Sequence, residues 1–208
     1  MDFEQLIQQP ESLRDDVWEQ EFLHQVAQTN VELIKEQPAE GPDGWPYLLV
    51  RTGGSEPFVK VAAWLATRGI GLAVNSHKMV PDYVFTYGMI WNFKQTGQFV
   101  SEPSQNSPGE VRLGPDAIFG APTEEYLPGY VRNILRQFLG AQGFEAVRIA
   151  VISSGDFKTV DLVFSEESLK IQGEAQQQTL AEAISWFLPL HYSLVFASEQ
   201  KLPGFIAL

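Results

Sequence analysis

The chain has 208 residues, of which 44% are hydrophobic and 12% aromatic, with a formal net charge of −12 and no cysteine. This composition is typical of a globular protein with a real core, and it excludes disulfides, thiolate metal sites and cysteine nucleophiles. A surface this acidic repels phosphate backbones and anionic lipids, so we expect neither a nucleic-acid nor a membrane partner.

The negative charge is concentrated near the N-terminus. Residues 1–40 hold ten acidic side chains against two basic ones, a local balance of −8. Between Glu11 and Glu36, apolar residues recur mostly at three- and four-residue steps, which predicts one amphipathic helix that begins near Ser12.

The acidic face of this helix has two interpretations. A basic protein partner could bind this face, because exposed opposite charges attract each other at distances up to about the Debye length. The candidate contact residues are Asp16, Glu19 and Glu21. The alternative is a solvated helix face that keeps the protein soluble.

A turn at 38–46 separates this helix from an alternating strand and helix pattern. The sequence predicts a buried strand at 47–52, a helix that begins at Pro57 and ends at Gly69, and a short strand at 71–75.

The run from Pro81 to Phe93 separates into two faces when it is read at period two. One face holds six large side chains: Tyr83, Phe85, Tyr87, Met89, Trp91 and Phe93. Successive side chains of a strand point to opposite faces, so this pattern predicts a long aromatic strand with a bulge at Gly88. Its aromatic face is either a core face covered by helices or a hydrophobic binding surface. A hairpin turn at 94–97 and a returning strand at 98–100 are expected next.

The composition then changes over 101–127, where prolines and glycines interrupt any periodicity. We expect this segment to connect residues 1–100, an N-terminal helix plus an α/β half, to a C-terminal α/β half at 128–208. Surface segments at 111–113 and 118–119 are expected within the connection. The second half shows a helix that begins at Pro128, strands at 146–152 and 159–164 joined by a turn at 153–156, a helix at 176–188 and a final strand at 191–197. The fold class is therefore α+β, a mixed or antiparallel sheet with helices packed on one face, in two sequential α/β halves.

Two short segments resemble a known family. Gly44-Trp45-Pro46-Tyr47-Leu48-Leu49-Val50-Arg51-Thr52, followed by a helix and then Gly69-Ile70-Gly71-Leu72-Ala73-Val74-Asn75, resembles the amino-terminal domain of the enhanced-serine-sensitivity family over about residues 45–100. Ser76 stands where that family carries a proline. The acidic, mixed α/β composition is also similar to type III secretion chaperones. Both resemblances imply a protein-binding role and supply no catalytic residue.

The most informative polar residues lie in the loop after the strand at 71–75. Asn75, His77 and Asp82 are close in sequence at strand ends, where functional loops gather, and Tyr87 follows. A pocket bordered by His77, Asp82 and Tyr87 would indicate a small-molecule binder or an enzyme. His24 and His191 have no second ligand nearby, and no pattern indicates a metal site or a cofactor.

The sequence therefore favours a non-catalytic protein-binding, adaptor or chaperone-like module, with a homodimer as a further expectation. A small-molecule binder or enzyme that uses the 75–82 loop and the aromatic strand is the alternative, and a purely structural homo-oligomer is a third. The acidic N-terminus and the absence of a long apolar run predict a cytoplasmic protein without a signal peptide.

Overall fold

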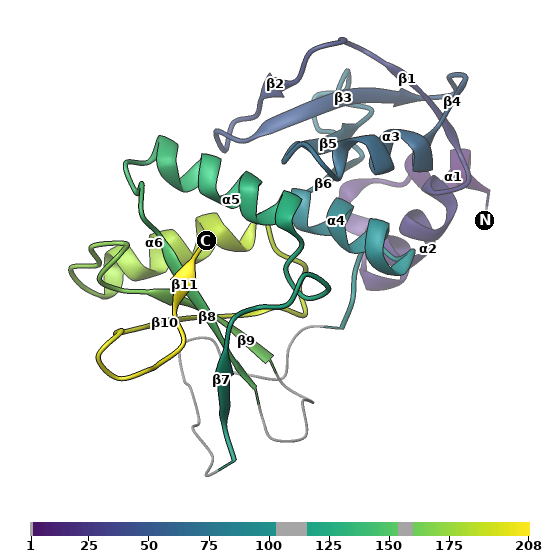
Figure 1. Cartoon of the computed structure of the whole chain (residues 1–208). Helices are drawn as coiled ribbons and strands as arrows, with labels where there is room; N and C mark the ends of the chain where they lie inside the picture. The colour runs from purple at the N-terminus through teal and green to yellow at the C-terminus, as the bar shows by residue number, and fades with distance from the viewer. Residues whose placement is uncertain (1, 103–115, 154–159) are drawn as a thin grey trace. The chain divides into compact units, whose positions relative to one another are not determined.

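The computed structural model describes residues 2–102, 116–153 and 160–208. The chain divides into two compact units, Met1–Phe99 and Val100–Leu208, coloured from purple to teal and from teal to yellow in Figure 1. Each unit holds a mixed sheet together with helices. The predicted α+β class, with two sequential α/β halves, is confirmed. No helix among the described residues has the length and apolar character that a membrane crossing requires.

The sheet of the first unit has the strand order β4-β1-β3-β5-β6. Its strands are β1 (Asn30–Leu33), β2 (Ala39–Glu40), β3 (Pro46–Thr52), β4 (Glu56–Pro57), β5 (Gly71–Val74) and β6 (Tyr83–Phe85). The pairing of β3 with β5 is parallel, whereas β1, β2 and β6 join antiparallel. Helix α3 (Phe58–Leu65) makes the crossover that a parallel pair needs, so the predicted order of strand, helix and strand is confirmed here.

The N-terminal segment is not the single long helix that the apolar pattern predicts. It forms α1 (Phe3–Ile7), the 3₁₀ turn η1 (Glu11–Leu13) and α2 (Asp16–Val26), and then enters strand β1. Helix α2 begins after Asp15, whose carboxylate accepts a 2.9 Å hydrogen bond from the backbone N–H of Trp18. It ends where the Thr29 hydroxyl bonds the carbonyl of Val26, because hydroxyl residues compete with the helix for backbone groups. The prediction of a start near Ser12 and an end near Glu36 was therefore wrong.

The aromatic run is also not one strand. Only β6 (Tyr83–Phe85) is extended, and the rest forms helix α4 (Tyr87–Thr96). The Thr86 hydroxyl caps this helix at the backbone N–H of Met89, and Gly97 ends it at a positive φ of 77°. Gly97 therefore closes a helix and not a hairpin, and 98–100 is not a strand. The spacing of Tyr87, Ile90 and Trp91 also fits one face of a helix. In the fold this face is buried, so tertiary packing stabilises the helix and not the strand.

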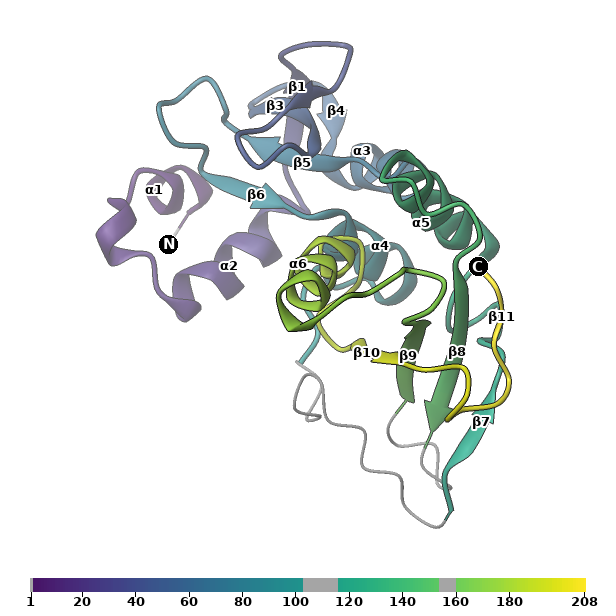
Figure 2. The ribbon, with the colours of Figure 1, turned by 90° about the vertical axis from the view of Figure 1, so that its left-hand side faces the viewer.

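The aromatic side chains of the first unit meet in one cluster, to which α2, α3, β6 and the segment after α4 contribute. Phe22 of α2 stacks on Tyr83 of β6 with ring centroids 5.0 Å apart. Phe85 lies 5.4 Å from Phe58 of α3 and 4.8 Å from Phe99. Figure 2 shows α1 and α2 beside β6, where this cluster joins the acidic N-terminal helices to the sheet. Of the two interpretations of the aromatic face, the core is the one that the structure supports.

The second unit is built on a sheet of order β10-β9-β8-β11, with β7 also paired to β8. Its elements are β7 (Ile118–Gly120), α5 (Gly129–Ala141), β8 (Arg148–Ser153), β9 (Val160–Ser165), α6 (Glu174–Ser185), β10 (Ser193–Ala197) and β11 (Ile206–Ala207). The predicted helices and strands of this half are confirmed within a few residues. The expected surface segment at 118–119 lies in strand β7, and β11 is an addition. Buried apolar side chains from β8, β9 and β10, including Ile152, Val163 and Val195, form its core. Residues 103–115 of the expected connection at 101–127, with its expected surface segment at 111–113, and most of the expected turn at 153–156 lie outside the described residues.

Candidate functional site

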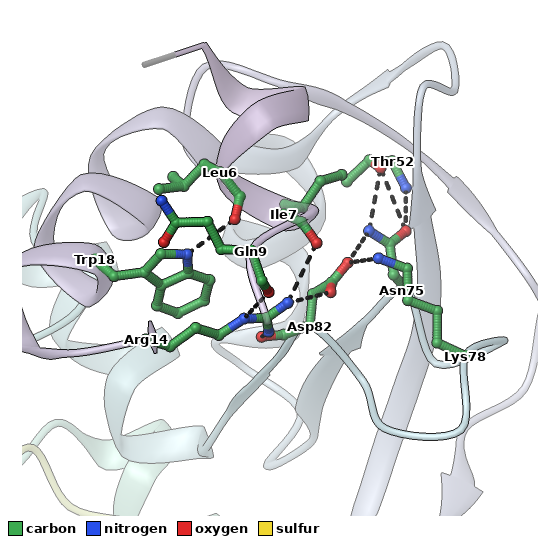
Figure 3. Close-up of polar contacts among 9 residues, drawn as sticks. All are labelled: Leu6, Ile7, Gln9, Arg14, Trp18, Thr52, Asn75, Lys78 and Asp82. Atoms are coloured by element: carbon green, nitrogen blue, oxygen red, sulfur yellow. Dashed lines mark hydrogen bonds and ion pairs between the residues drawn. The ribbon is translucent and has the colours of Figure 1, made fainter. Parts of the chain in front are cut away.

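The loop between β5 and β6 is held at its base by the side chain of Asn75. This residue directly follows β5 and takes the left-handed conformation with φ of 56°. Its side-chain oxygen accepts a 2.9 Å hydrogen bond from the backbone N–H of Thr52, at the end of the neighbouring strand β3. Its amide group donates a 2.7 Å hydrogen bond to the carboxylate of Asp82 (Figure 3). Asn75 therefore links two strand ends to the far end of the loop.

Asp82 is a buried carboxylate that three side chains surround. Besides Asn75, it meets the Lys78 ammonium at 2.5 Å and the Arg14 guanidinium at 3.0 Å. The backbone closes the same loop, because the N–H of Asp82 bonds the carbonyl of Val74 and the N–H of Lys78 bonds that of Asn75. A buried charge is tolerated when it is paired and fully hydrogen-bonded, and this carboxylate meets both conditions.

Arg14 connects this loop to the N-terminal helices. Its guanidinium donates to the Asp82 carboxylate and backbone carbonyl, and also to the carbonyls of Ile7 and Gln9 at the end of α1 (Figure 3). The same group lies 4.6 Å from the centre of the Trp18 ring, and the Trp18 indole N–H bonds the carbonyl of Leu6. Cationic groups stabilise the carbonyl end of a helix, so one arginine both caps α1 and neutralises Asp82.

A hollow of about 470 Å³ opens beside this network. Its lining combines two cations, two acids and apolar side chains from both the loop and α1: Ile7, Gln8, Glu11, Arg14, Lys78, Val80, Pro81 and Asp82. The size lies within the range of small-molecule pockets. The pocket expected from the sequence is found only in part, because Asp82 lines this hollow whereas His77 and Tyr87 do not.

The outer part of the loop is apolar and exposed. Met79 is 101% exposed and the neighbouring Val80 is 54% exposed. His77 lies exposed on the same loop. Asn75 and Asp82, which the sequence analysis offered as contact residues, are buried and act inside the loop, while His77, Met79 and Val80 face solvent.

The remaining predicted site residues lie elsewhere. Tyr87 is fully buried, and its hydroxyl donates a 2.6 Å hydrogen bond to the carbonyl of Ala66 after α3, which is a core role. Glu19 accepts a hydrogen bond from the Tyr83 hydroxyl, so it links α2 to β6. Burial and this carboxylate hold the pKa of Tyr83 well above its ordinary value. Asp16 and Glu21 are exposed on α2.

Two residues of this network, Arg14 and Lys78, were not predicted as site residues. The Lys78–Asp82 pair had a signal only in its closeness along the sequence, because the two residues are four apart in one short loop. Arg14 had none, since 68 residues separate it from Asp82 and only the folded chain brings them together.

Within residues 2–102, 116–153 and 160–208, no group of three or more His, Cys, Asp or Glu side chains has the geometry to hold a metal ion. A scan against protein-family models, a search of curated proteins and a search of solved structures each found no match. The resemblance to the enhanced-serine-sensitivity family therefore stays a prediction from short motifs, and the resemblance to type III secretion chaperones a prediction from composition.

Proposed function

We propose that the chain is a protein-binding module that presents the β5–β6 loop to its partner, with Met79 and Val80 as the apolar contacts. The observation that carries this proposal is the full exposure of Met79 on a loop whose base is fixed by a buried polar network. Methionine adapts its shape to different apolar surfaces and is common where proteins bind partners. His77 on the same loop adds a polar contact.

The fixed base of the loop supports binding, because fewer loop residues lose conformational entropy when a partner binds. A loose loop loses conformational entropy when a partner holds it, at about 0.5–1.5 kcal/mol for each side chain that becomes immobile. Here Asn75, Lys78 and Arg14 already restrain the loop through Asp82. Only the outer side chains remain to be ordered.

The test is affinity capture from native lysate with quantitative mass spectrometry, comparing wild type with a Met79→Ser/Val80→Ser loop variant. We expect at least one protein to be retained by wild type and depleted more than tenfold with the loop variant, because two apolar contacts are lost. Leu190→Ser is the matched control, since Leu190 is an exposed apolar residue of the second unit.

Thermal unfolding of all three proteins shows whether the fold is intact. Exposed substitutions away from special contacts change stability by about 0.5 kcal/mol or less, so similar melting curves are expected. Identical captured proteins for wild type and the folded loop variant would refute the proposal.

The hollow beside Asp82 favours a second candidate, a small-molecule binder. Because the Arg14 guanidinium is largely buried against Asp82, recognition would fall on the Lys78 ammonium, which binds Asp82 but is more exposed, and on Glu11, with Ile7 and Val80 as apolar walls. A ligand screen by thermal shift tests this candidate. Stabilisation that Lys78→Gln abolishes, in a variant that remains folded, would support it, whereas no stabilisation by any compound class would count against it.

A further inference from the structure

Helix α3 and the turn after it carry an exposed basic and aromatic stripe on an otherwise acidic protein. Lys60 and Trp64 are four residues apart and so share one side of the helix, and Arg68, in the turn after it, contacts Trp64. All three are exposed, as are Ala63 and Thr67 beside them, and Trp64 is 45% exposed. None of these five residues is acidic. We call this set the α3 stripe.

The two large side chains of the α3 stripe support each other. The Arg68 guanidinium lies 3.8 Å from the centre of the Trp64 ring, and it donates a 2.7 Å hydrogen bond to the Trp64 backbone carbonyl. Stacking and hydrogen bonding fix both side chains before any partner arrives. Tryptophan and arginine are the residues most enriched at the energetic centres of protein interfaces, and fixed side chains lose less entropy on binding.

A complementary surface lies on the same chain. Along η1 and α2, Leu13 is 65% exposed and Val17 is 73% exposed. Exposed acidic or polar residues lie next to them on α2, namely Asp16, Gln20 and Glu21. Gln20 and Glu21 lie three and four residues after Val17 on α2 and so share one side with it, whereas Leu13 lies in η1, before the extended residues Arg14 and Asp15. We call these five residues the α2 surface. Glu19 is not part of it, since it is partly buried and binds Tyr83, whereas the Glu21 carboxylate is exposed and binds Gln25 of the same helix.

We propose that the α3 stripe binds the α2 surface of a second copy of this chain. Trp64 would pack on Leu13 and Val17, while Lys60 and Arg68 meet Asp16 and Glu21. Each copy carries both surfaces, so a two-fold pair makes the contact twice and closes without leaving either surface free. Charge complementarity favours this occupant, because residues 1–40 carry a balance of −8 and the α3 stripe is basic. This pairing uses neither Met79 nor Val80, so it is independent of the proposed function.

Sedimentation equilibrium from ~1 μM to ~1 mM, a range that covers weak and moderate association, tests the pairing. Wild type should shift from the monomer mass of 23.3 kDa to twice that mass as concentration rises. The dissociation constant should increase with salt, because exposed charges are screened over ~8–10 Å. Trp64→Ser should raise it more than tenfold.

A charge exchange gives the decisive comparison. Lys60→Glu/Arg68→Glu makes both surfaces acidic, and Asp16→Lys/Glu21→Lys makes both basic, so each variant alone should remain monomeric. In an equimolar mixture, the acidic α3 stripe of one variant meets the basic α2 surface of the other, and the second contact pairs the remaining acidic and basic surfaces. A heterodimer should therefore form. All the exchanged residues are exposed, and unfolding curves check that both variants are folded.

Wild type that stays at the monomer mass over the whole range would overturn the proposal. Dimers that persist in both charge variants, or a mixture that fails to restore them, would overturn it as well. The Met79→Ser/Val80→Ser variant should dimerise as wild type does, which separates this test from that of the loop.

Discussion

The side-chain amide of Asn75 and the carboxylate of Asp82 lie 2.7 Å apart and join the two ends of the β5–β6 loop. The pair stands between two strand ends on one side and the N-terminal helices on the other, because Asn75 also binds Thr52 and Asp82 also binds Arg14. The stability of the first unit and the shape of its exposed loop therefore depend on the same polar groups.

Asp82→Ala should lower the free energy of unfolding by roughly 2–4 kcal/mol. The change leaves the largely buried Arg14 guanidinium without its counter-charge, and breaking a buried pair costs far more than an exposed one. Glu32→Ala is the matched control, since Glu32 and Arg51 form an ion pair in which both side chains are half exposed, with an expected effect below about 1 kcal/mol. Urea unfolding measures both, and equal losses would show that the Asp82 network contributes no more than a surface pair.

Replacing Asn75 separates its hydrogen bonds from its backbone conformation. Asn75→Gly keeps a φ of 56° without strain but removes the amide, which should cost about 1–3 kcal/mol because the N–H of Thr52 and the Asp82 carboxylate each lose a partner. Asn75→Ala adds a left-handed alanine and should cost about 1 kcal/mol more. Unfolding of both variants in urea gives the difference. An alanine variant as stable as the glycine variant would mean that the loop changes conformation and the backbone is not held.

Trp91→Ala should cost roughly 3–5 kcal/mol, because the ring is fully buried in helix α4. Trp64→Ala provides the control for the same chemical change on the surface, with an expected loss of about 1 kcal/mol or less. Melting curves and urea midpoints distinguish the two. An unchanged urea midpoint for Trp91→Ala would contradict burial of the ring and favour the interpretation of the aromatic run as a binding surface.

Tyr83→Phe should lower stability at neutral pH by about 1–2 kcal/mol, since Glu19 loses its hydrogen-bond donor. The pKa of Tyr83 is raised in the folded protein by burial and by Glu19, so the folded state keeps this proton to higher pH than the unfolded state does. Its contribution is therefore complete below about pH 10 and decreases as the pH rises above that value. The phenylalanine variant should lose less stability between neutral and strongly alkaline pH than wild type. Parallel pH profiles of the two proteins would contradict the assignment.

The Tyr83–Glu19 contact also changes the interpretation of the acidic helix. Replacing Asp16, Glu19 and Glu21 together by lysine would disturb the packing of α2 on β6 as well as the surface charge. Asp16 and Glu21 alone test the surface.

Periodicity predicted the fold where one pattern was unambiguous. The strand at 47–52, the helix after Pro57 and the strand at 71–75 occur as β3, α3 and β5, since apolar content and Gly or Pro punctuation agreed there. The run from Tyr83 to Phe93 fits both period two and the helical period, and only the Thr86 and Gly97 caps favoured helix. The loop residues Asn75 and Asp82 could be located from their positions at strand ends. Arg14 could not, because its role depends on a long-range contact that leaves no local pattern.

The interior position of β1 limits how this chain can be shortened. Strand β1 lies between β4 and β3, and the helix before it contributes the buried Trp18, Phe22 and Val26. The acid-rich first 40 residues resemble a detachable tail by composition, yet trimming them would remove an inner strand and open the flank of β3 to pairing with other chains. A cut within 30–33 should therefore unfold the whole first unit and release no stable fragment. Because strand pairing protects this segment, limited proteolysis should leave it intact until the unit unfolds.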